Sequence, residues 1–130
     1  MGIDRKSTWI VDGDLNANFT SNPIATNGAR AAQLQWNWAG TSTPNGTFYV
    51  QGSDDGTVYF DMKLAKVHVA LGGTAVAAHT NDAAAITVNS SSAGRAHTTV
   101  EFPPAHMRLA YVSSSGGAVD TLQGRYRLIK

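Results

Sequence analysis

Apolar and polar residues alternate along most of this chain with a period of two. The clearest run is residues 31–40, where Ala32, Leu34, Trp36 and Trp38 alternate with glutamine and asparagine. Successive side chains of a β-strand point to opposite faces of its sheet, so this alternation predicts a half-buried strand. The two tryptophans have the parity of Leu34, and we expect them to pack in the core.

The stretch GTFYVQGSDDGTVYF, residues 46–60, predicts a β-hairpin around two adjacent carboxylates. Aromatic and β-branched residues, which favour strands, lie on both sides of Asp54 and Asp55. The Asp-Gly step that ends at Gly56 is a strong turn signal, because glycine tolerates positive φ. We therefore place the hairpin tip at residues 52–56. The two aspartates are interpreted as turn residues, in preference to a calcium loop or an active site.

The rest of the chain also predicts short strands separated by turns. Residues 106–130 are expected to form a terminal hairpin around the Ser-Gly loop 113–117, and residues 80–82 a turn between two short strands. Residues 95–102 predict another strand, which two prolines end. About eight to ten short strands, with turns about every 8 to 12 residues, are typical of an all-β fold. We expect an antiparallel β-sandwich of jelly-roll or related Greek-key topology.

The 130 residues fit a single domain, 1–130, in which residues 1–8 are a possible N-terminal arm. No secretory signal is visible, and no apolar run approaches the ~20 residues of a membrane helix. Ten basic and nine acidic residues give a net charge of +1, so we expect neither a nucleic-acid nor a membrane partner. Charged residues make up 15% of the chain, below the usual ~25%. Uncharged polar residues therefore build most of the surface.

Motifs for catalysis or cofactor binding are missing from the sequence. There is no cysteine, the four histidines lack the spacing of a zinc site, and no phosphate-binding loop occurs. The serine-rich loops lack the G-x-S-x-G pattern of a nucleophile elbow. We expect a protein that is not an enzyme and holds neither cofactor nor metal. A buried set of His97 or His106 with Glu101 would point to catalysis instead.

Two arginines near the C-terminus share one face of a predicted strand. Arg125 and Arg127 flank Tyr126 in the segment GRYRLIK, so they predict a small positive stripe. Such a stripe is either a solvated strand face or a contact for nucleic acid or an acidic partner, and we favour the solvated face because the patch is short. The candidate assembly contacts are Ile3, Arg5, Lys6, Trp9, Arg125 and Arg127.

Two separated segments resemble the small β-sandwich structural proteins of tailed bacteriophages. In those proteins a strand L-x-W-x-W/T-G leads to G-x-F-x-V-Q-x-S-x-D-G, and the chain closes with a proline, an R-L-x-Y strand, a Ser-Gly loop and a final lysine. The resemblance implies a non-enzymatic cement or decoration protein on the capsid surface of a virion, made in the host cytoplasm. Its implied partners are the major capsid protein and copies of itself, as a dimer or trimer. The matching residues are Trp36, Gly40, Gly46, Phe48, Val50, Gln51, Ser53, Asp55, Gly56, Pro104, Arg108, Leu109, Tyr111, Ser115, Gly116, Leu122 and Lys130.

The central hairpin also resembles that of discoidin-like, galactose-binding-like jelly rolls. This second resemblance implies an alternative function, a glycan-binding module of a phage tail or bacterial surface protein. Its hallmark would be exposed aromatic rings beside polar groups in a concavity, with Trp36, Trp38, Tyr49 and Tyr59 as the candidates. The matching residues are Phe48, Val50, Ser53, Asp55, Gly56 and Tyr59.

Overall fold

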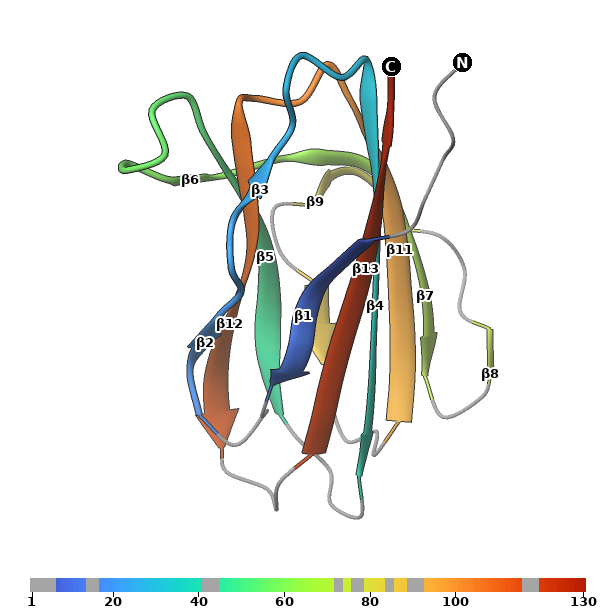
Figure 1. Cartoon of the computed structure of the whole chain (residues 1–130). Coiled ribbons are helices and arrows are strands. Elements are labelled where there is room, and N and C mark those ends of the chain that lie inside the picture. Colours follow the sequence, from blue (N-terminus) through green and yellow to red (C-terminus); the bar gives the residue numbers. More distant parts are fainter. Residues whose placement is uncertain are drawn as a thin grey trace.

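The computed structural model describes two antiparallel β-sheets packed face to face (Figure 1). This arrangement confirms the predicted all-β sandwich. The described part of the chain contains no helix long and apolar enough to cross a membrane. The described residues are 7–13, 17–40, 45–71, 74–75, 79–83, 86–88, 93–115 and 120–130.

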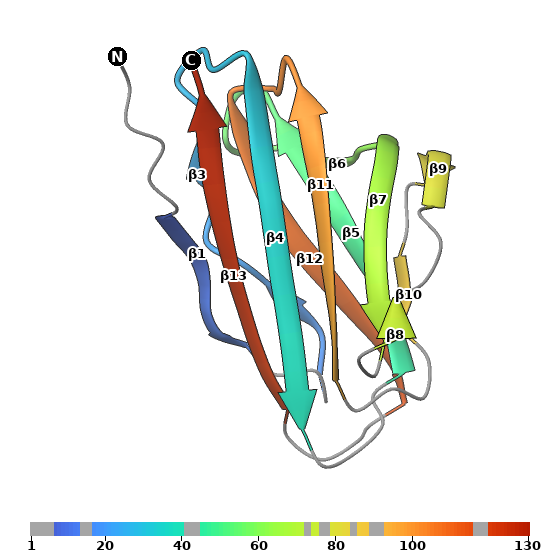
Figure 2. The same ribbon diagram turned by 90° about the vertical axis from the view of Figure 1, so that its right-hand side faces the viewer.

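Seven strands form the larger sheet, which faces the viewer in Figure 2. They are β1 (Ser7–Gly13), β4 (Ala31–Gly40), β7 (Leu64–Leu71), β8 (Thr74–Ala75), β9 (His79–Ala83), β11 (Ala93–Glu101) and β13 (Asp120–Ile129). Their order is β1-β13-β4-β11-β7-β8, and β9 also pairs with β7. The three long strands β13, β4 and β11 therefore form the middle of this sheet.

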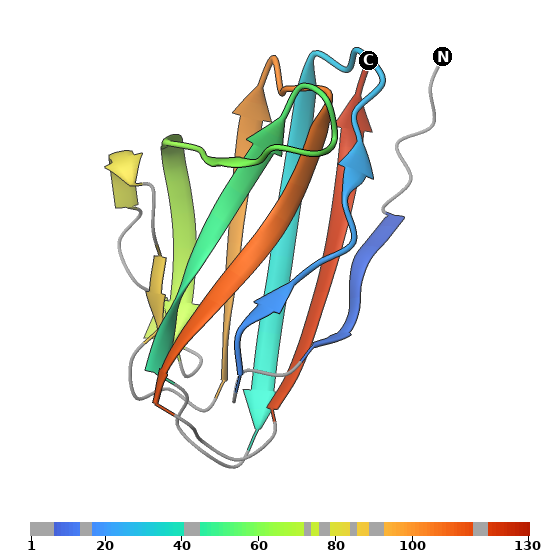
Figure 3. The same cartoon turned by 90° about the vertical axis from the view of Figure 1, so that its left-hand side faces the viewer.

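Six strands form the smaller sheet (Figure 3). They are β2 (Phe19–Thr20), β3 (Ile24–Ala25), β5 (Asn45–Ser53), β6 (Phe60–Asp61), β10 (Ile86–Val88) and β12 (His106–Ser115). The order is β10-β5-β12-β2, with β3 also paired to β12 and β6 to β5. Strands β2 and β3 are two halves of one edge strand. Ser21 bridges the gap, because its N–H donates to the Leu109 carbonyl (2.8 Å) and its Oγ accepts from the Leu109 N–H (2.9 Å).

At most connections the chain passes from one sheet to the other, and the resulting strand order is that of a jelly roll. We count β2 and β3 as one strand and set aside β6 to β9. The remaining strands, numbered along the chain, then lie in the orders 1-8-3-6 and 2-7-4-5. This is the jelly-roll arrangement, one of the two topologies predicted. Strands β7, β8 and β9 extend the larger sheet beyond it.

The predicted terminal hairpin over residues 106–130 is wrong. Its two arms are strands β12 and β13, and they lie in different sheets. Strand β12 pairs with β5, whereas β13 pairs with β4 and β1. Alternation of apolar residues reveals that a segment is a half-buried strand, but it carries no information on which strand pairs with it.

Two predicted turns also differ from the structure. Strand β5 continues through Ser53, and its return arm β6 is only two residues long, so the tip is residues 54–59 rather than 52–56. Val58 is exposed in this tip, despite the strand propensity of its neighbours. The turn expected at residues 80–82 is part of strand β9.

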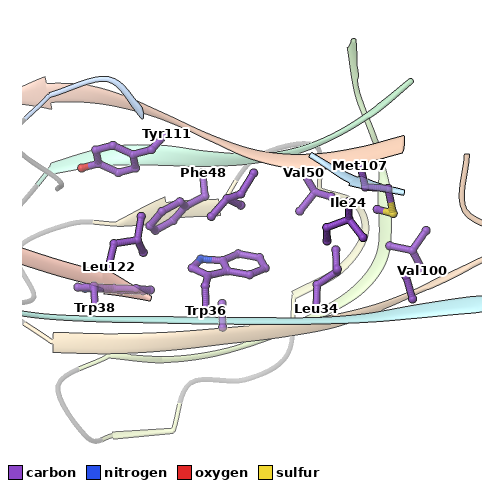
Figure 4. Packing of buried hydrophobic residues seen from close by; sticks show 13 residues of the cluster. Ile24, Leu34, Trp36, Trp38, Phe48, Val50, Val100, Met107, Tyr111 and Leu122 are labelled. Atoms are coloured by element: carbon purple, nitrogen blue, oxygen red, sulfur yellow. The ribbon is translucent and has the colours of Figure 1, made fainter. Parts of the chain in front are cut away.

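The core is centred on the ring of Phe48 (Figure 4). This ring lies 5.7 Å from Trp36, 5.4 Å from Trp38 and 4.8 Å from Tyr111, measured between ring centroids. Phe48 and Tyr111 come from the smaller sheet, and the two tryptophans come from β4 of the larger one. All four side chains are buried, so the predicted inward orientation of Trp36 and Trp38 is confirmed. These rings are the main aromatic contact between the sheets.

The fold predicts that Phe48→Ala is strongly destabilising. Removal of this ring leaves a cavity between the two tryptophans and Tyr111, which costs about 3 to 5 kcal/mol of the free energy of unfolding. Urea denaturation measures the loss. Phe102→Ala is the matched control, because Phe102 is 79% exposed and its loss should change stability by no more than about 0.5 kcal/mol. Equal effects of the two substitutions would contradict the assigned core.

Candidate functional site

The structure describes three of the six candidate assembly residues. Ile3, Arg5 and Lys6 lie outside the described residues, and Trp9 belongs to strand β1. Arg125 and Arg127 lie on β13, on the face opposite the buried Leu122 and Gly124. The predicted arginine stripe is therefore on the outer face of the larger sheet.

Strand register joins the two arginines to side chains of β4 and β11. Arg127 lies opposite Gln33, and Gln33 lies opposite Thr99 on the far side. In the same way, Arg125 lies opposite Gln35, and Gln35 lies opposite His97 on its other side. Directly opposite residues on one face have Cβ atoms about 5 Å apart, so each row is a continuous strip of side chains. We call the outer surface of β13, β4 and β11 the arginine face; its residues are Gln33, Gln35, Asn37, Arg95, His97, Thr99, Gln123, Arg125 and Arg127.

The arginine face is positively charged over its described residues. A third row runs from Gln123 through Asn37 to Arg95. Three arginines thus stand among four uncharged amides, one histidine and one threonine. Glu101 has the same outward parity and lies opposite Ala31, so it forms the end of this face, in the row next to Arg127, Gln33 and Thr99. An acidic group on a partner would therefore meet a favourable potential here.

A hollow of about 250 Å³ lies over the rows of Arg127 and Arg125 on this face. Gln33 and Arg127 in this lining are half-buried, whereas Gln35, His97, Thr99 and Arg125 are exposed. None of its lining residues is acidic. The hollow is smaller than a typical small-molecule pocket, and its size suits one or two side chains of a partner protein. It is lined by Gln33, Leu34, Gln35, His97, Thr98, Thr99, Arg125, Tyr126 and Arg127.

The side chains of this surface are suited to forming hydrogen bonds with polar groups. A guanidinium presents a planar fork of donors that matches a carboxylate, and amides both donate and accept hydrogen bonds. His97 and Glu101 are both exposed and lie four residues apart on β11, roughly 13 Å along the strand. They therefore do not form the buried pair that acid–base catalysis would require. Within the described residues, no group of three or more His, Asp or Glu side chains could hold a metal ion.

Asp55 organises the loop between β5 and β6. Its Oδ1 accepts hydrogen bonds from the Val58 N–H (2.9 Å), the Thr57 N–H (2.8 Å) and the Ser53 hydroxyl (2.9 Å). These bonds stabilise the ionised form and lower the pKa of Asp55 to about 2. Gly56 has a φ of +76°, and its N–H donates to Ser53 Oγ (2.9 Å). Asp55 is thus a turn residue, as the sequence predicts.

A second set of contacts holds the return arm of the same loop. The Arg108 guanidinium lies 4.0 Å above the Tyr59 ring, and its Nε donates to Gln51 Oε1 (2.8 Å). Gln51 Nε2 in turn donates to Asp61 Oδ1 (2.9 Å). Residues 54–61, which we call the 54–61 loop, are therefore tied to the sheet at both ends. In Figure 1 the loop extends away from the sandwich beside the label of β6.

The aromatic residues proposed for glycan recognition do not form an open platform. Trp36 and Trp38 are buried in the core. Tyr49 and Tyr59 are half-buried, and Arg108 covers one face of the Tyr59 ring. A sugar stacks on an accessible ring face, so the structure gives the glycan-binding alternative little support.

Comparisons with known proteins find similarity at the level of the fold. No protein-family model and no curated protein sequence matches the chain. The solved structure of the SPBc2 prophage-derived protein YomS is similar, with a TM-score of 0.55 and 13% identity over 98% of this chain and 96% of that one. The PBSX exported protein XepA is also similar, with a TM-score of 0.53 and 14% identity over 98% of this chain. That match spans 37% of XepA. Both structures share the fold of this chain.

The Asp55 turn predicts a low midpoint for acid titration of the loop. The pKa of this carboxyl is lowered from 3.8 to about 2 in the folded state, so its contribution to loop order is complete above pH ~4 and is lost as the pH falls through ~2. The amide proton shifts of Thr57 and Val58, followed by NMR, should titrate with a midpoint near 2. Asp55→Asn should abolish this transition. A midpoint near 3.8 would show that the three hydrogen bonds do not form in solution.

Proposed function

We propose that this chain is a non-enzymatic virion protein that binds the outside of a bacteriophage capsid as a cement or decoration protein. Copies made in the host cytoplasm attach to the assembled shell and to one another. Each copy contributes a modest contact, and the regular lattice of the capsid multiplies these contacts into a stable coat. The shell is stabilised because its subunits are cross-linked from outside.

The fold-level likeness to YomS carries this proposal. YomS is a prophage-derived protein, and the similarity extends over 98% of this chain and 96% of that one. The second similar structure, XepA, is an exported protein of PBSX. The resemblance of two sequence segments to structural proteins of tailed phages points in the same direction. The likeness supports a phage origin and a structural role.

The arginine face supports the protein-binding part of the proposal. Arginine is enriched at protein interfaces, and the amides beside it form hydrogen bonds without a large desolvation cost. The whole face is built on three long, adjacent strands, so its side chains are held in fixed positions. A rigid polar surface of this kind suits a partner that is itself rigid, such as a capsid lattice or a neighbouring copy.

The N-terminal segment is assigned to the shell contact. Ile3 and Trp9 supply apolar area, and Arg5 and Lys6 supply charge. Such a segment suits attachment to a groove or an exposed sheet edge of the major capsid protein. Arg125 and Arg127, on the strand β13 that pairs with β1, are assigned to contacts with neighbouring copies.

Co-sedimentation with empty capsids of the encoding phage tests this function. The protein should pellet with capsids at a saturating ratio that matches the number of equivalent lattice sites. Deletion of residues 1–6 should weaken binding at least about tenfold, because it removes the shell contact. Lys63→Glu, which reverses an exposed charge elsewhere, should bind as the wild type does. A folded protein that stays in the supernatant at every concentration would refute the proposal.

A further inference from the structure

The 54–61 loop has a fixed shape before it meets a partner. The Asp55 hydrogen bonds set its first half, and the stack of Arg108 on Tyr59 sets its second. The bond between Gln51 and Asp61 then ties its end to β5. A loop already ordered in the free protein loses little conformational entropy on binding, which favours association.

The exposed surface of this loop is both acidic and apolar. Asp54 and Asp61 are exposed, and the segment contains a third aspartate but no lysine or arginine. Val58 is 69% exposed and Phe60 49% exposed. Large apolar side chains surrounded by charges on a rigid loop are typical of a recognition element, since the apolar groups gain most from burial. A suitable receptor has basic groups around a shallow hollow.

The arginine face contains such a receptor. Arg125 and Arg127 border its hollow on one side and His97 on the other, with no acidic residue in the lining. The alkyl stems of the two arginines offer apolar surface to Val58 and Phe60, and the exposed Arg125 places its guanidinium beside the half-buried Arg127. The charges of the 54–61 loop and of the hollow are therefore complementary within one sequence.

The loop and the hollow lie on opposite sides of the sandwich. Figure 2 faces the strands that carry the hollow, whereas Figure 3 faces the smaller sheet, in front of which the loop passes. The loop therefore cannot reach the hollow of its own chain. A contact between the two surfaces joins two different copies.

We propose that the 54–61 loop of one copy docks in the hollow of the arginine face of the next copy. Asp54 and Asp61 pair with Arg125 and Arg127, and the exposed apolar residues of the loop cover the arginine stems. Asp55 remains committed to the turn that presents them. This inference deepens the proposed function, because it names the surfaces that link copies of a coat protein.

The contact is heterologous, since each copy uses a different surface toward each neighbour. Such a contact generates a closed ring when the rotation between copies closes, and an open chain when it does not. It does not generate a dimer with two equivalent interfaces. Charge pairs near the rim of such a contact make its strength depend on salt.

Two charge-reversal variants test the contact by sedimentation velocity. The loop variant is D54K/D61K and the face variant is R125E/R127E. Wild type should assemble with rising concentration, and each variant should weaken that assembly at least about tenfold. An equimolar mixture of the two variants should restore assembly, because the reversed loop matches the reversed face. Arg30→Glu is the control, as Arg30 is exposed outside both surfaces; circular dichroism and urea midpoints confirm folding.

Three results would overturn the inference. They are a wild type that stays monomeric up to about 1 mM, variants that assemble as the wild type does, and a mixture that stays monomeric. Capsid binding is measured separately. A monomer that pellets with capsids would therefore contradict the loop contact alone, whereas an assembled protein that ignores capsids would contradict the proposed function alone.

Discussion

The structure depends on the packing of Phe48 against Trp36, Trp38 and Tyr111 between the two sheets. This contact holds β4 of one sheet against β5 and β12 of the other. Because side chains alternate along a strand, an inward set of tryptophans on β4 places the glutamines and asparagine between them outside. The alternation of side chains along β4 thus supplies both the tryptophans of the core and the amides of the arginine face.

The same architecture separates the residues of the core from the surfaces proposed for recognition. The aromatic core lies between the sheets, whereas the arginine face and the 54–61 loop lie on the outside and are held by strand register and local hydrogen bonds. Substitutions on these outer surfaces therefore leave the main inter-sheet contacts intact. The proposed coat-protein role fits this separation, because such a protein must remain folded while its surfaces engage several neighbours. The jelly roll also places the arginine face and the 54–61 loop on opposite sides, which suits the proposed array of copies.

The sequence predicted the local features of this molecule well and the long-range ones poorly. The parity of Trp36 and Trp38 predicted the core, and that of Arg125 and Arg127 predicted a shared outer face. Gln33 and His97 were missed as their neighbours, because they come from segments far apart in the chain and only register brings them together. The terminal hairpin failed for the same reason, since strand pairing is not encoded in alternation. The exposure of Val58 was missed because its sequence neighbours favour a strand.

Chemical modification of arginine in the capsid-bound protein tests the central claim, that the arginine face is an assembly surface. Mass spectrometry measures the modification of each arginine by an arginine-selective reagent, on capsids and in the free protein. We expect Arg125 and Arg127 to be protected on the capsid, while Arg30, which is exposed elsewhere, reacts equally in both states. Equal reactivity of all three arginines in both states would show that the face remains open to solvent and would contradict the claim.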